Sequence, residues 1–163
     1  MTGMSGSRGT IAIVTLGLAS CASSPERACE RLTVGEQGVA RADYLPCAAA
    51  MVEAMNTLDR LGETLAKGRD AATEQDANRE LLRLQRMVKA VGGVKGLQQE
   101  WGDGVVSQFN RATADALGMY AVAFYGVGVP FNPIPGISAH NVQMAREAAD
   151  PARAAYEQIR QDR

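Results

Sequence analysis

Few side chains in this sequence are of the types that catalyse reactions or bind metals. His140 is the single histidine, and hydrolysis needs a nucleophile, a base and an oxyanion site together. His140, Met144 and Glu147 would share one helical face, which fits either a weak soft-metal site or an ordinary surface. The sequence holds no glycine-rich phosphate loop, Cys-x-x-Cys pair or nucleophile elbow. We therefore expect no enzyme, no cofactor and no metal site.

A second chemical feature is Cys21, which ends the sequence Leu18-Ala19-Ser20-Cys21 after a short apolar run. A leucine stands three positions before the cysteine, and small residues fill the two positions between. This motif resembles the lipobox of bacterial lipoproteins. The resemblance implies that Cys21 becomes the lipidated first residue of the mature chain. Several acyl chains would then hold the protein on a membrane, since one chain alone binds only marginally.

The residues before Cys21 resemble the signal peptide of that family. Residues 1–9 carry one charge, Arg8, and the apolar stretch 10–20 has eleven residues. A helix of that length spans about 16 Å, which is too short for a hydrocarbon core of about 30 Å. The alternative is an apolar N-terminal element that ends in a buried thiol. We expect a removed signal peptide at 1–20, a lipidated N-terminus and tether at 21–24, and one helical domain at 25–163.

Cys29 and Cys47 are the two other cysteines, and 18 residues separate them. In an exported chain, two remaining thiols predict one disulfide. Two buried free thiols, or a metal pair that lacks further ligands, are the alternatives. A zinc site would need four nitrogen or sulfur ligands. On the chain-entropy model, a disulfide with this loop would stabilise the fold by roughly 3 kcal/mol.

The residues after Cys21 indicate where the domain would sit. Ser24 and Pro25 are typical of a helix N-cap and first position, so only two residues separate the lipid from the cap. The domain would begin within about 10 Å of the bilayer. In the lipoprotein family, an aspartate after the cysteine favours retention in the inner membrane, and here Ala22 takes that place. The resemblance thus implies the outer membrane, with the domain facing the periplasm.

Length and charge exclude other classes. Residues 21–163 form a chain long enough for one domain with a genuine core. They carry 16 Lys and Arg against 18 Asp and Glu. This near-neutral balance provides neither a basic nucleic-acid footprint nor a polybasic patch for lipid heads. We expect no nucleic-acid partner and a membrane contact made by acyl chains.

Apolar periodicity predicts an all-α fold, a compact bundle of about four main helices with short extra helices. Aromatic residues are 5% of the chain, and β-branched runs are scarce. The first expected main helix covers Pro46–Lys67, and Asp70 is expected to cap a second one that extends to Val91. Asp103 is expected to cap a third helix that runs to about Tyr125. A final pair begins at Ser138 and covers about 138–149 and 151–161, with a kinked single helix as the alternative. Short helices are expected at 26–32 and 94–101, and a loop at 33–44. Met51 and Met55 fall on the core stripe, while the charges at Arg79, Glu80, Arg83 and Arg86 predict a solvated face.

The segment 126–136 is the least ordinary part of the expected domain. Its three prolines and three glycines disfavour a helix or a central strand. In an extended chain, Val127, Val129 and Phe131 would point the same way, and Ile134 follows. These four residues either form a docking site for a partner or cover their own bundle.

These features together predict a non-catalytic accessory or adaptor lipoprotein of the bacterial cell envelope. It would bind another envelope protein through Val127, Val129, Phe131 and Ile134. The alternative is a binding protein for a small apolar or lipid-like ligand held in the bundle. A cavity lined by Met51, Met55, Met119 and Phe124 would favour that alternative.

Overall fold

The computed structural model describes residues 25–32, 41–92, 104–125 and 137–161. These residues form five helices: α1 (Pro25–Glu30), α2 (Arg41–Lys67), α3 (Ala71–Gly92), α4 (Val105–Tyr125) and α5 (Ala139–Gln161). No strand occurs in the described ranges. The predicted all-α bundle is therefore confirmed. The segment 94–101, where a short helix was predicted, lies outside the described residues.

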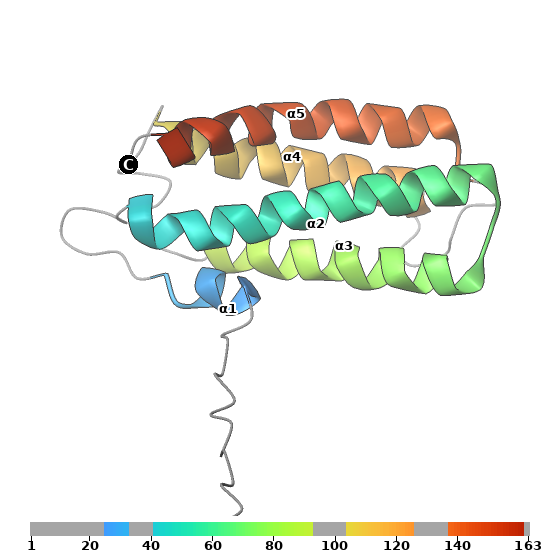
Figure 1. Ribbon diagram of the computed structural model, residues 1–163, viewed down its shortest axis with the longest axis horizontal. Coiled ribbons are helices and arrows are strands. Elements are labelled where there is room, and N and C mark those ends of the chain that lie inside the picture. Colours follow the sequence, from blue (N-terminus) through green and yellow to red (C-terminus); the bar gives the residue numbers. More distant parts are fainter. Residues whose placement is uncertain (1–24, 33–40, 93–103, 126–136, 162–163) are drawn as a thin grey trace, which may run out of the picture.

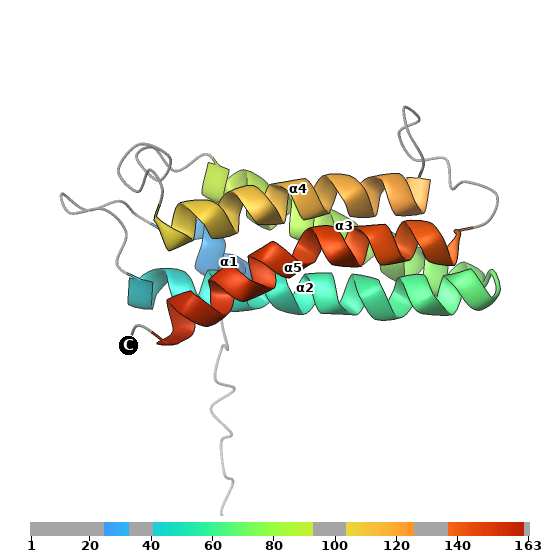
Figure 2. The same cartoon turned by 90° about the horizontal axis from the view of Figure 1, so that it is seen from above.

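Helices α2 to α5 form an up-down-up-down bundle, and successive helices run antiparallel (Figures 1 and 2). In sequence order, each helix packs beside the next, and α5 closes the ring against α2. The short helix α1 lies outside this ring and contacts only α2 and α3. The bundle is thus a four-helix core with one short helix attached to its side.

The helix starts that polar caps predicted are confirmed at two places. The amide of Thr73 donates to Asp70 Oδ2 at 2.9 Å, which begins α3. The amide of Asn141 donates to Ser138 Oγ at 3.1 Å, which begins α5. Each cap satisfies one of the N–H groups that the first helical turn leaves without a partner. Asp103, expected to cap α4, lies outside the described residues.

The predicted start of α2 at Pro46 is wrong, because the helix already begins at Arg41. Residues 41–44 were expected in a loop. Pro46 lacks an N–H, so the helix loses one backbone hydrogen bond there. Tyr44 offsets this loss: its side chain is fully buried, and its ring meets Phe109 of α4 edge-on, with centroids 6.0 Å apart. Burial of an aromatic side chain outweighs the local proline signal.

The predicted break at Asp150 and Pro151 is also wrong, because α5 runs through it as one helix; the alternative, a single helix with a kink, is confirmed. Figure 2 shows that the C-terminal part of α5 turns away from the direction of its N-terminal part, as an internal proline causes. Arg153 reaches across the proline and donates from NH1 to the carbonyl of Arg146 at 3.2 Å. The buried face continues on both sides, with Ala149 and Ala152 fully buried. Packing therefore keeps one helix where the local sequence favours two.

Small residues allow the helices of the core to approach closely. The buried alanines of α5 are Ala145, Ala149, Ala152 and Ala155, and Ala116 and Ala123 of α4 are buried as well. Between α2 and α5, a Cβ on Gly62 would lie only 2.9 Å from Val142 Cγ1. Glycine is therefore the residue that this crossing accommodates, because interiors are packed without spare volume.

Candidate functional site

The α1 junction, where α1 meets α2, contains the disulfide between Cys29 and Cys47. The two sulfurs are 2.09 Å apart and the Cα atoms 4.8 Å apart. Both cysteines are at most 1% exposed, and they belong to the hydrophobic core of the bundle. The disulfide connects α1 covalently to the bundle. This bond stabilises the position of α1, because a six-residue helix has little stability of its own.

An ion-pair cluster around Arg83 forms a second connection at the α1 junction. Arg83 Nε lies 2.9 Å from Glu26 Oε1 of α1, and its NH1 lies 2.8 Å from Glu80 Oε1. Arg83 NH2 lies 3.6 Å from Glu53 Oε2 of α2. One guanidinium thus joins three helices. The solvated face predicted for α3 is wrong at Glu80 and Arg83, whose side chains are only 14% and 17% exposed.

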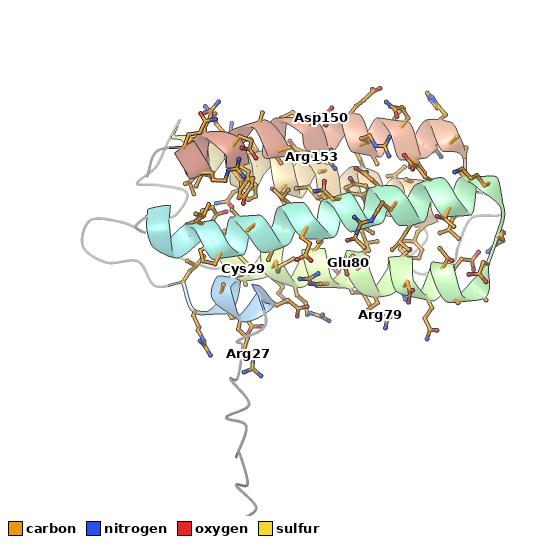
Figure 3. All side chains as sticks on the ribbon, viewed as in Figure 1. Arg27, Cys29, Arg79, Glu80, Asp150 and Arg153 are labelled. Carbon is orange, nitrogen blue, oxygen red and sulfur yellow. A yellow bond between two sulfur atoms is a disulfide. The ribbon has the colours of Figure 1, made fainter. Side chains whose placement is uncertain are left out.

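The rest of that predicted face is solvated. The side chains of Arg79 and Arg86 are 70% and 63% exposed. In Figure 3 Arg79 points away from the bundle, while Glu80 lies between α3 and α2. Helical periodicity explains the difference, because α1 covers only part of the polar side of α3.

A pocket of about 480 Å³ opens between the C-terminal part of α3 and the N-terminal half of α4. Its apolar wall consists of Met51, Val88 and Val91. Its polar wall consists of Ser107, Asn110 and Arg111, all on α4. This volume lies within the usual range for small-molecule sites, about 300–1,000 Å³. The pocket is therefore a candidate binding site with one apolar and one polar side.

Tyr44 fixes the polar wall of the pocket from inside the protein. Its hydroxyl donates to Asn110 Oδ1. Burial raises the pKa of Tyr44, so this hydroxyl keeps its proton, although the contact with Asn110 acts in the opposite direction. Because Asn110 Oδ1 accepts this hydrogen bond, the N–H groups of the same side chain can donate to a ligand in the pocket. Thr113 also lines the pocket, but its hydroxyl donates within α4 to the carbonyl of Phe109 at 2.8 Å.

A buried polar cluster joins α2, α4 and α5 elsewhere in the bundle. Asp59, only 7% exposed, accepts a hydrogen bond from the Tyr120 hydroxyl at 2.6 Å. Arg153 NH2 donates to the other carboxylate oxygen at 2.5 Å, and Arg146 Nε lies 3.5 Å from it. Burial and the neighbouring Asp59 raise the pKa of Tyr120, while Arg153 lowers it.

This cluster supports the fold and shows no sign of a reactive group. Both oxygens of Asp59 have charged or hydroxyl partners, as a buried carboxylate requires. The sequence analysis missed it. The available signal was a carboxylate four residues after Met55, on the buried face of α2.

Most residues predicted to act in function lie outside the described ranges. These are Cys21 and the segment residues Val127, Val129, Phe131 and Ile134. His140 is exposed near the start of α5, and Met144 is 43% exposed. No group of three His, Cys, Asp or Glu that could hold a metal ion occurs in the described part of the chain. None of the described helices is long and apolar enough to cross a membrane.

The cavity expected for an apolar ligand differs from the one observed. Of its four expected lining residues, only Met51 contacts the pocket. Met55 is fully buried in the core and Phe124 is 4% exposed.

Comparison with known proteins gives no relative: no protein-family model, curated protein or solved structure matches this chain. The α1 junction, the pocket and the motif at Cys21 are thus the features on which a function can be based.

Proposed function

We propose that this chain is a lipid-anchored accessory protein of the bacterial cell envelope, which acts by binding another envelope protein and not by catalysis. The observation that carries the proposal is the sequence Leu18-Ala19-Ser20-Cys21 four residues before Pro25, where α1 begins. Since α1 is connected to α2 by the disulfide, a lipid on Cys21 would hold the whole bundle close to its membrane.

Two further features support this location. A disulfide between Cys29 and Cys47 suits an oxidising compartment such as the periplasm. Ala22 follows Cys21, which in the lipoprotein family favours the outer membrane. We place the bundle on the periplasmic face of that membrane.

Metabolic labelling tests the lipid anchor directly. The unsubstituted chain, expressed in a bacterium, should incorporate labelled palmitate and fractionate with membranes. Cys21→Ser should lose both properties, whereas the neighbouring control Ser23→Ala should retain them. A Cys21→Ser chain that still carries label and stays in the membrane fraction would refute the anchor.

Site-specific crosslinking tests the partner. A photo-crosslinker at position 129 should capture one envelope protein, because Val129 belongs to the apolar segment proposed to dock. The same crosslinker at position 79, where the side chain is 70% exposed, provides the matched control. Equal capture from both positions, or none from position 129, would contradict a docking role for this segment.

A second candidate function is the binding of a small ligand. The pocket of about 480 Å³ at the α3–α4 seam favours it. This function does not exclude the first, because the pocket and the segment 126–136 are different parts of the chain.

A further inference from the structure

The pocket at the α3–α4 seam combines two kinds of surface. The apolar wall, Met51, Val88 and Val91, comes from α2 and α3. The polar wall, Ser107, Asn110 and Arg111, comes from one face of α4. A ligand that fills such a site needs an apolar body and a polar head on opposite sides.

The positive charge of Arg111 in the polar wall favours a ligand whose head group is negatively charged. Arg111 is exposed at the pocket. It takes part in none of the ion pairs found among the described residues. Ser107 also lies in the first turn of α4, which begins at Val105. The helix dipole favours negative charge there.

One donor of this wall, the amide of Asn110, is held in place before any ligand arrives. The buried hydroxyl of Tyr44 occupies Asn110 Oδ1, which leaves the N–H groups of that amide for an acceptor. Guanidinium and amide N–H groups together match the oxygens of a carboxylate. A fixed donor loses little entropy on binding.

We propose that this pocket binds a small amphipathic carboxylate. Its apolar body lies against Met51, Val88 and Val91, and its head accepts hydrogen bonds from Arg111 and Asn110. The proposal rests on the second candidate function, names its ligand class, and is independent of the lipid anchor.

Titration of the full-length chain carrying Cys21→Ser tests this with decanoate as the probe. Decanol and decyltrimethylammonium have the same chain length with a neutral and a cationic head. Calorimetry should show saturable binding that is tightest for decanoate and weakest for the cation. Amide NMR signals of Val88, Val91 and Ser107 should shift with the same saturation curve.

Three variants assign the binding to the pocket. Arg111→Gln should weaken decanoate about fivefold, as for a partly exposed ion pair, and leave decanol unchanged. Arg79→Gln, which removes an arginine elsewhere on the surface, should change neither. Ala114→Trp fills the pocket from an exposed lining position and should abolish decanoate binding. Ser107→Phe provides a second filling variant if the tryptophan lowers the helix content.

Some results would overturn the proposal. These are an absence of saturable decanoate binding, equal affinity for all three probes, or Arg111→Gln behaving like Arg79→Gln. Shifts confined to residues away from the α3–α4 seam would also overturn it. Each of these outcomes is independent of palmitate labelling, so the lipid anchor can fail or stand separately.

Discussion

Removal of the disulfide at the α1 junction should separate the stability of α1 from that of the bundle. The perturbation is Cys29→Ser with Cys47→Ser, made in a Cys21→Ser chain so that no thiol remains. The disulfide spans 18 residues, and a loop of this size contributes roughly 3 kcal/mol on the chain-entropy model. For a chain of this length, that loss corresponds to a fall in Tm of about 10 °C.

The structure also predicts where the loss appears. Without the disulfide, α1 keeps the ion pairs of Glu26 with Arg83 and Arg86 and the packing of Ala28 against the core. Six residues are too few to form a helix alone. The amides of α1 should therefore exchange with solvent at nearly unfolded rates. The amides around Leu58 and Leu84, whose side chains are fully buried, should remain protected.

Chemical denaturation and hydrogen exchange together check this prediction. The Cys21→Ser chain, kept under reducing conditions, is the matched control, because it lacks the disulfide and keeps both cysteine side chains. An unfolding free energy unchanged within about 0.5 kcal/mol would refute the entropy estimate. Loss of protection in α2 and α3 together with α1 would refute the separation of α1 from the bundle.

In the lipid-anchored form that we propose, the same double substitution should change the reach of the anchor. With the disulfide, only the few residues between Cys21 and Pro25 separate the lipid from a fixed helix. Without it, the chain from Cys21 to Arg41 spans 20 residues, which can extend to about 66 Å. Energy transfer between a dye on α5 and dyes in the lipid headgroups should fall. Unchanged transfer would show that α1 stays docked.

Three further predictions concern the core. Tyr120→Phe removes a donor from the buried Asp59 and should cost about 1–3 kcal/mol in urea unfolding; a loss below about 0.5 kcal/mol would contradict a shared hydrogen bond. Gly62→Ala places a Cβ 2.9 Å from Val142 and should lower unfolding free energy by about 1–3 kcal/mol, with Gly68→Ala in open space as control. Tyr44 and Tyr120 have pKa values raised above the ordinary 10.0, so the unfolded chain releases these protons first. Stability is then fully present below pH 10 and should fall above it by up to about 1.4 kcal/mol per pH unit for each tyrosine. Because burial raises the pKa of Tyr125 as well, unfolding curves measured from pH 9 to 11 should lose less than half of this slope in Tyr120→Phe.

Local sequence predicted those elements whose signals agree with their packing. The caps at Asp70 and Ser138, and the stripe containing Met51 and Met55, became helix starts and core. The two prolines led to wrong helix boundaries, because a proline favours a boundary through its own backbone and says nothing of the packing around it. At Pro46 and Pro151 the flanking buried side chains outweighed one lost hydrogen bond, which a local pattern does not contain.

Polar residues also show that a local sequence pattern does not predict tertiary contacts. Glu80 and Arg83 have the spacing of a solvated helix face, but their side chains are only 14% and 17% exposed, because α1 and α2 both pack against α3. Asp59 and Tyr120 are 61 residues apart, so no local pattern pairs them. The pocket likewise depends on α3 and α4 lying side by side at that end of the bundle.

The sequence by itself determined the helical class, because its apolar residues recur at helical spacing, and it pointed to Cys21 and to a Cys29–Cys47 pair. Tertiary structure decided what those helices enclose. It attached α1 to α2 and α3, gave Asp59 its buried partners, and formed one amphipathic pocket. The physical reason is that helical periodicity is local, whereas burial and charge pairing depend on residues distant in the chain.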